Sequence, residues 1–122
     1  MIDLKTLQNY LLEKQGSVEE TPFGPQALVY KVMGKMFALV AWEENPLTIS
    51  LKCDPNEALF LRDLYQAVIP GYHMNKRHWN TVTIDGTIPD LEFWRMIDDS
   101  YKLVVRGLKK AEREILNRPS GQ

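Results

Sequence analysis

A chain of 122 residues, with 44% hydrophobic and 25% charged residues, is long enough to bury one hydrophobic core and too short for two ordinary domains. One cysteine excludes an internal disulfide, the N-terminus lacks the pattern of a signal peptide, and no apolar run is long enough to span a membrane, so we expect a cytoplasmic protein. The net charge of −1 argues against a dedicated high-affinity nucleic-acid binder, because such proteins are usually basic. We expect a single domain over residues 1–117, followed by a frayed tail at 118–122.

Periodicity, capping residues and turn signals predict the secondary structure. In chain order the expected elements are a helix at 3–14, a loop at 17–26, strands at 27–33, 36–42 and 47–53, a helix from 54 to before 70, a strand at 79–84, a long helix from 89 and a short basic helix after it. Gly34-Lys35 predicts a two-residue type II′ hairpin turn, because glycine stands at the first central position. Asp54 before Pro55 predicts a helix N-cap.

The order of these elements predicts the fold class. A helix, three antiparallel strands, a second helix, about two strands and one or more final helices keep strands and helices in separate runs. Such segregation favours an α+β fold, in which an antiparallel sheet packs on helices that cover one of its faces.

Candidate functional residues gather in the stretch 70–82, which reads PGYHMNKRHWNTV. No acidic residue occurs between positions 64 and 84, whereas Lys76, Arg77, Trp79 and both histidines lie in this interval. A basic, aromatic and acid-free segment is typical of a surface that binds an anionic partner.

Several motifs together carry a resemblance to a known family. In chain order they are Pro22-Phe23-Gly24, Gly34-Lys35-Met36-Phe37-Ala38, Leu51-Lys52-Cys53, the stretch 70–82, Asp85-Gly86, Asp98-Asp99-Ser100-Tyr101 and Leu103-Val104. In this order and spacing, the chain resembles the MmcQ/YjbR family of small bacterial proteins over residues 3–106. The most specific part is the run from Asn75 to Val82, which contains Asn-Lys-x-His-Trp-x-Thr-Val.

The resemblance implies a fold like that of the secretion chaperones, with a helix, three strands, a helix, two strands and a helix. The family is commonly labelled DNA-binding because of a two-winged shape. The resemblance therefore implies weak DNA binding through a basic and aromatic loop, and it supplies no catalytic residue and no cofactor.

Trp79 has two interpretations. In a strand that begins at this residue, Trp79 and Thr81 share one face, whereas Val82 and Ile84 share the other. The indole then lies on the more polar face, where it is able to stack on a base or anchor a partner. The alternative is that the last long helix or the loop covers the indole as part of the core.

The remaining candidate contacts are polar or charged side chains near Trp79. They are Asn75, Lys76, Arg77, His78 and, from the first hairpin, Lys35. Lysine and arginine here would pair with phosphates or carboxylates. The alternative is a solvated basic turn, because lysine and arginine are exposed in most proteins whether or not they bind anything.

The sequence indicates neither a metal site nor a catalytic site. His73, His78 and Cys53 do not supply the four ligands of a closed zinc site, and Cys53 falls at an apolar position of a strand, where a thiol is usually inert. Asp98 and Asp99 are adjacent, so they lie about 100° apart on a helix and do not face each other. We expect no cofactor and no enzymatic activity.

Three hypotheses of function follow. The first is weak, salt-dependent and largely sequence-independent DNA binding by the basic and aromatic loop. The second is an interaction module for a protein or a small ligand, in which Arg77 and Trp79 make the contacts. The third is an enzyme, which would require a pocket that joins His73, His78 and a carboxylate. The sequence indicates no membrane association and gives no oligomeric state.

Overall fold

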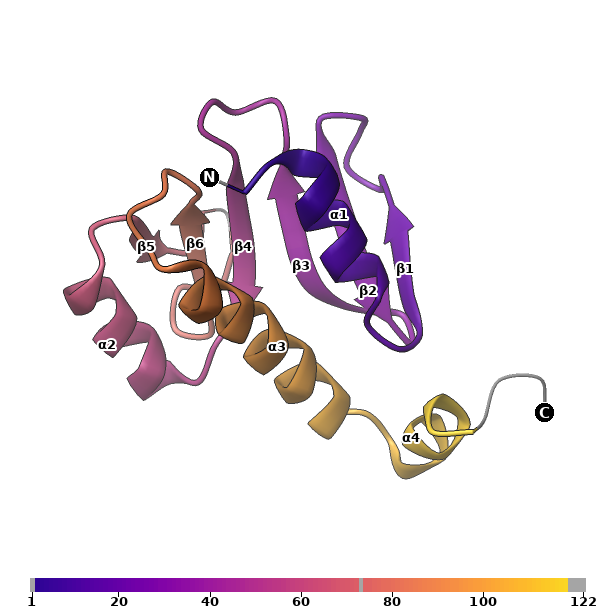
Figure 1. Cartoon of the computed structure of the whole chain (residues 1–122). Helices are drawn as coiled ribbons and strands as arrows, with labels where there is room; N and C mark the ends of the chain where they lie inside the picture. The colour runs from indigo at the N-terminus through magenta and orange to yellow at the C-terminus, as the bar shows by residue number, and fades with distance from the viewer. Residues whose placement is uncertain (1, 73, 119–122) are drawn as a thin grey trace.

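The structure is a computed structural model that describes residues 2–72 and 74–118. These residues form four helices and one six-stranded antiparallel sheet (Figure 1). In chain order the elements are α1 (Leu4–Leu12), β1 (Ser17–Glu20), β2 (Ala27–Val32), β3 (Lys35–Ala41), β4 (Thr48–Lys52), α2 (Pro55–Leu64), β5 (Val68–Pro70), β6 (Trp79–Thr83), α3 (Asp90–Arg106) and α4 (Lys110–Leu116). The predicted α+β class is confirmed.

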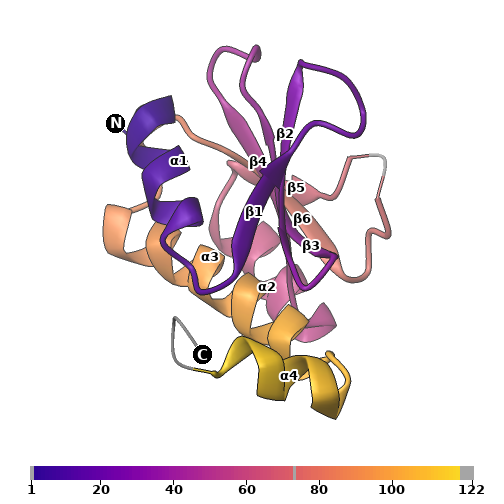
Figure 2. The same ribbon diagram turned by 90° about the vertical axis from the view of Figure 1, so that its right-hand side faces the viewer.

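The strands are arranged in the order β1-β2-β3-β4-β6-β5. Viewed along its edge, the sheet has α1 and α3 on one side (Figure 2). The helix α2 packs on the same side, because its Leu61 belongs to the core cluster. No helix of the described chain covers the opposite side, which we call the uncovered face. The sheet therefore offers one buried face and one face that is open to a ligand.

The core forms between the helix side of the sheet and the long helix α3. Alternate strand residues point toward the helices, so Tyr30, Val40 and Ile49 are fully buried. The apolar stripe of α3 meets them with Phe93 and Ile97, which are 2% and 0% exposed. The apolar side chains that recur every 3.6 residues in α3 and every two residues in the strands therefore pack into one continuous apolar layer.

Two polar side chains cap helices as their positions predict. The Asp54 side chain accepts hydrogen bonds from the backbone N–H groups of Asn56 and Glu57, and Pro55 occupies the first turn of α2. The Asp3 side chain accepts from the Thr6 N–H over 2.8 Å at the start of α1. Both helices therefore begin where a short acceptor side chain is available for their free N–H groups.

The expected loop at 17–26 is wrong in its first part, which forms the edge strand β1. This strand pairs with β2, so that Glu19 lies opposite Tyr30 and accepts a hydrogen bond from its hydroxyl over 2.6 Å. Glu20 forms an ion pair with Lys31 over 3.0 Å. The strand is exposed and polar, and it lacks the apolar alternation by which a strand is recognised in a sequence.

The turn of the first hairpin also differs from the prediction. Met33 and Gly34 form the two-residue loop, and their φ angles are 49° and 79°. Positive φ at both central residues indicates a type I′ turn rather than type II′. Lys35 is already the first residue of β3, where it pairs with Val32.

The C-terminal region contains the short basic helix that was expected, as α4. Residues 119–122 of the predicted tail lie outside the described residues. Across the part of the chain that is described, every helix is too short or too polar to cross a membrane.

Candidate binding groove on the uncovered face

The loop between β5 and β6 contains most of the candidate residues, and Gly71 fixes its start. The Gly71 N–H donates to the Trp79 carbonyl over 2.8 Å. A Cβ at Gly71 would lie 2.7 Å from the Trp79 Cβ and 3.0 Å from its carbonyl oxygen. Glycine is therefore needed for the two segments to approach this closely.

Arg62 of α2 fixes the end of the same loop. Its Nε donates to Asn80 Oδ1 over 2.7 Å, and a terminal nitrogen donates to the carbonyls of Trp79 and Lys76. The buried Asn80 amide in turn donates to the Ala58 carbonyl over 3.3 Å. Sequence reasoning missed Arg62, because an arginine in the last turn of a helix ordinarily indicates no more than a favourable interaction with the helix dipole.

Trp79 lies on the uncovered face. It pairs with Lys52 in the β4–β6 ladder, and its neighbour Asn80 faces the helices. The indole is half-buried and lines a groove together with Thr81, two residues further along the strand. The alternation predicted for residues 79–84 therefore gives the correct face, and α3 does not cover the indole.

The polar candidates are only partly gathered around Trp79. Lys76 and Arg77 are exposed in the turn that precedes it, and the Asn75 side chain accepts a hydrogen bond from the Arg77 N–H over 3.0 Å. The Lys76 ammonium group donates to the Gly71 carbonyl over 3.3 Å. Asn75 lines the groove, so the two cations lie directly after a groove residue in the chain.

Two further candidates are placed differently. The His78 carbonyl accepts the Cys53 N–H over 2.7 Å, which continues the β4–β6 pairing by one residue. Lys35 lies opposite the core residue Val32, so it points to the helix side, away from Trp79. Lys35 therefore does not join the basic group at the loop.

The groove itself has a volume of about 730 Å³ and runs over the uncovered face. The described residues that line it are Phe23, Ala27, Met36, Leu39, Ala41, Glu44, Thr48, Ser50, Ile69, Tyr72, Met74, Asn75, Trp79 and Thr81. Large side chains on its rim are strongly exposed: Tyr72 is 69%, Phe23 63% and Ile69 47% exposed. Sequence reasoning missed these residues; a signal was available in the unbroken apolar run of β3, which supplies apolar side chains to both faces.

The floor of the groove has paired polar groups. The Ser50 and Thr81 hydroxyl oxygens lie 2.8 Å apart in a hydrogen bond across β4 and β6. Thr81 Oγ1 also accepts the Tyr72 N–H over 3.1 Å, which joins the loop to the floor. Because these hydroxyls already have partners, the free surface of the groove is mainly apolar and aromatic.

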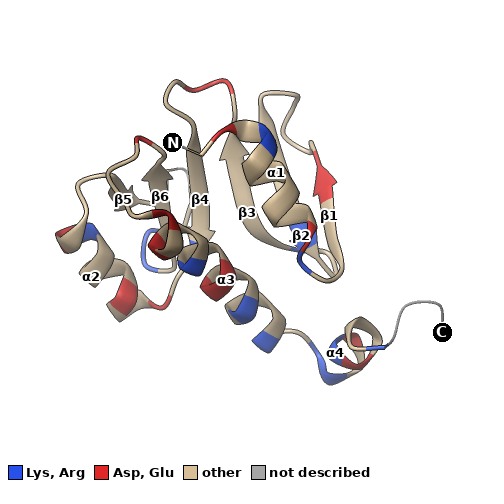
Figure 3. Cartoon of the chain, viewed as in Figure 1, with Lys and Arg blue, Asp and Glu red and all other residues tan. Residues whose placement is uncertain are grey.

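Basic and acidic residues occupy different connections of the sheet that carries the groove, as the colours of the ribbon show (Figure 3). The basic turn of Lys76 and Arg77 precedes β6, while Glu43 and Glu44 occupy the connection between β3 and β4. The strands place these segments at opposite ends, because β6 begins beside the basic turn and β3 ends beside the acidic connection. An occupant therefore meets positive charge at one end of the groove and negative charge at the other.

The histidine and cysteine side chains of the described residues lie outside the groove. Within residues 2–72 and 74–118, no three His, Cys, Asp or Glu side chains come together in a way that could hold a metal ion. His73, which the metal and enzyme hypotheses both need, lies outside the described residues. Burial raises the pKa of the Cys53 thiol to about 11, with smaller contributions from nearby carboxylates, so this thiol is a poor nucleophile at neutral pH.

Known proteins resemble this chain over most of its length. The sequence model of the YjbR family matches residues 12–103. The chain is 34% identical to the uncharacterised protein YjbR of Escherichia coli K12, over 93% of this chain and 96% of that protein. It is 40% identical to the uncharacterised protein YbdF of Escherichia coli O157:H7, over 76% of each. The fold is also similar to the crystal structure of protein DR2400 of Deinococcus radiodurans, which has a DUF419 domain. The match covers 100% of this chain and 93% of that chain, with a TM-score of 0.89 and 40% sequence identity.

Proposed function

Since the chain belongs to the YjbR family of small α+β domains, we propose that it is a non-enzymatic binding domain that holds an extended segment of another protein in the groove of the uncovered face. The segment carries bulky apolar side chains, and an acidic group lies at the end beside Lys76 and Arg77. The observation that carries the proposal is the apolar and aromatic lining of this groove, which no helix of the described chain covers.

The size and exposure of the lining support a binding role. Phe23, Ile69 and Tyr72 come from three different parts of the chain, and each leaves much of its surface open to water. Contiguous exposed apolar surface of this kind marks interaction sites in monomeric proteins. A volume of about 730 Å³ falls in the range of roughly 300–1,000 Å³ that is typical of binding pockets.

The charges around the groove favour a protein segment over nucleic acid. No lysine or arginine is among the described residues that line the groove, whereas nucleic-acid affinity depends mainly on cations that contact phosphates. Lys76 and Arg77 supply two cations at one end, which suit a single carboxylate or a chain terminus. Glu44 at the other end would repel a phosphate backbone that followed the groove.

Weak DNA binding is the second candidate, and the loop at 75–79 carries it. Lys76 and Arg77 are exposed beside a half-buried indole, and the acid-free interval 64–84 surrounds them. A single strand suits this arrangement better than a duplex, because a base can stack on Trp79 while its phosphates contact the cations. In this alternative the affinity falls steeply with salt.

A non-enzymatic role is supported by the titratable groups of the groove. Among the described residues that line it, Glu44 and Tyr72 are the ionisable ones. A carboxylate and a phenol from two separate connections are not a recognisable acid–base constellation.

The test is selection of random twelve-residue peptides displayed on phage against the full chain, followed by fluorescence anisotropy with the enriched peptides. We expect peptides with two or more large apolar residues at alternate positions and an acidic residue near one end. Trp79→Ala and Phe23→Ala should each weaken binding about tenfold, whereas Leu91→Ala, at an 85% exposed position on α3, should leave it unchanged.

The same assay includes labelled twelve-residue oligothymidylate at 50 and 200 mM salt. Binding of this oligonucleotide that exceeds that of every peptide, and that Lys76→Ala/Arg77→Ala abolishes, would overturn the proposal in favour of DNA binding. Enrichment of no peptide above background would overturn it as well. Phe23 is 63% exposed, so its alanine variant is informative even when Trp79→Ala fails to fold.

A further inference from the structure

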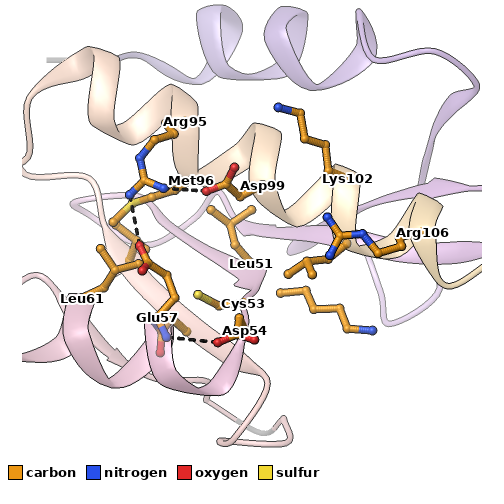
Figure 4. A pocket seen from close by; sticks show the side chains of 14 residues that line it. Leu51, Cys53, Asp54, Glu57, Leu61, Arg95, Met96, Asp99, Lys102 and Arg106 are labelled. Carbon is orange, nitrogen blue, oxygen red and sulfur yellow. Dashed lines mark hydrogen bonds and ion pairs between the residues drawn. The ribbon is translucent and has the colours of Figure 1, made fainter.

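A second cavity lies on the helix side of the sheet, between α2, β4 and α3 (Figure 4). It has a volume of about 170 Å³ and shares no lining residue with the groove. The residues that line it are Leu51, Lys52, Cys53, Asp54, Glu57, Leu61, Asn80, Val82, Arg95, Met96, Asp99, Lys102, Leu103 and Arg106. We call this cavity the helix-side pocket.

The floor of the helix-side pocket is apolar. Leu51, Leu61 and Met96 are 3%, 4% and 5% exposed, and the half-buried Cys53 thiol lies beside them. The thiol is protonated at neutral pH, so it adds a neutral and polarisable surface. An apolar cavity of about 150 Å³ holds a molecule the size of benzene, so the floor accepts one six-membered ring or a short acyl chain.

The carboxylates of the rim already have polar partners within the protein. The Arg95 guanidinium forms ion pairs with Glu57 over 3.3 Å and with Asp99 over 2.5 Å (Figure 4). It forms a third ion pair with Glu92, outside the pocket lining. The Asp54 carboxylate accepts backbone N–H groups at the start of α2. These carboxylates therefore have partners without any ligand.

The basic side of the rim has no such partners. Among the described residues, the side chains of Lys52, Lys102 and Arg106 form no hydrogen bond or ion pair. Lys102 and Arg106 are four residues apart on α3, so they share one side of the helix. Lys52, the last residue of β4, also lines the pocket, although its ladder partner Trp79 lies on the uncovered face. Two cations of α3 that form no ion pair among the described residues, Lys102 and Arg106, thus border the apolar floor.

We infer that the helix-side pocket binds a small organic anion, whose apolar body of about one ring lies on Leu51 and Met96 and whose carboxylate or phosphate meets Arg106 and Lys102. The apolar floor supplies contact area, and the anionic group supplies an ion-pair partner for Lys102 and Arg106, which form no ion pair among the described residues. Arginine is well suited to this role, because its planar fork binds carboxylate and phosphate through two parallel hydrogen bonds. This site is independent of the proposed function, because it lies on the opposite face of the sheet.

The experiment is a titration of the ¹⁵N-labelled full chain with benzoate, followed by amide chemical shifts. We expect millimolar binding, with shifts concentrated at 51–54 and 95–106 and absent from the groove strand β3. Lys102→Ala/Arg106→Ala should weaken benzoate binding about five- to tenfold. The matched control is Lys109→Ala/Lys110→Ala, which removes two exposed cations outside the pocket and should leave binding unchanged.

Three further probes separate the ring from the charge. Phenyl phosphate should bind at least as tightly as benzoate, whereas benzyl alcohol, which has the ring without the charge, should bind at least five times more weakly. Benzylamine tests whether the acidic side of the rim dominates instead. The inference is overturned when benzylamine or benzyl alcohol equals benzoate, when 20 mM benzoate shifts no pocket amide, or when the Lys102/Arg106 variant retains full affinity.

Discussion

Ser100 of α3 offers a sharp test of how the helix and the sheet are joined. The β3–β4 ladder ends with the pair Ala38–Leu51, and the next rung would join Phe37 and Lys52. The Ser100 hydroxyl occupies that position: it donates to the Phe37 carbonyl over 2.6 Å and accepts the Lys52 N–H over 2.9 Å. The residue is 0% exposed, so water cannot replace it.

Ser100→Ala removes both hydrogen bonds and leaves two backbone groups without partners. Each unsatisfied buried group costs about 1–3 kcal/mol, so we expect the free energy of unfolding to fall by about 2–4 kcal/mol. For a chain of this size, that change corresponds to a decrease of roughly 10 °C in the melting temperature. The measurement is urea unfolding followed by circular dichroism, with the slope m compared between variants.

Ser50→Ala is the matched control for this prediction. Ser50 is 5% exposed, but its hydroxyl bonds to the Thr81 side chain, and Thr81 keeps its bond from the Tyr72 N–H. We expect its alanine variant to lose only about 1 kcal/mol. The reasoning is refuted if the free energies of unfolding of Ser100→Ala and Ser50→Ala differ by less than about 0.5 kcal/mol while the slope m is unchanged. This margin is comparable to the error of the extrapolation.

Two other predictions concern the thiol and the loop. Because the pKa of Cys53 is about 11, its thiolate fraction at pH 8 is roughly 200-fold below that of an ordinary thiol. Iodoacetamide should therefore modify the native chain much more slowly than the urea-unfolded chain, and a native rate that levels off by pH 9 would contradict this. The unfolded thiol loses its proton first, so this group's contribution to stability should decline as the pH rises from about 8.5 to 11. Arg62→Ala should lower the free energy of unfolding by about 2 kcal/mol and accelerate tryptic cleavage after Lys76 and Arg77. Arg62→Lys should behave in the same way, because lysine lacks the planar guanidinium that reaches three acceptors. Unchanged cleavage would show that Arg62 does not hold the loop.

Local signals in the sequence were sufficient for most of the fold. Caps at Asp3 and Asp54 and the alternation of apolar residues in β4 and β6 depend on neighbours within a few positions. The edge strand β1 was missed because it is paired on one side only and has no buried face, so its residues remain polar. The hairpin turn was misassigned because the backbone conformation of Met33 is unusual for a residue with a side chain.

The candidate sites were harder to predict, since both combine distant segments. Phe23, Met36 and Trp79 meet in the groove only after four strands have paired. Trp79 was identified because the phase of its own strand places it on the uncovered face. Lys35 lies apart from Trp79 in the structure, and its position in a hairpin did not indicate toward which face its side chain points, because the turn type was not known.

The two cavities lie back to back against the same pair of strands. Along β4 and β6, Ser50 and Thr81 face the groove, whereas Leu51, Asn80 and Val82 face the helix-side pocket. A slip of one residue in the β4–β6 pairing would exchange these sets, so one hydrogen-bond register determines the composition of both cavities. The occupants would be separated by a single layer of backbone, and thermodynamic linkage then requires that whatever effect one has on the affinity of the other is returned in equal measure.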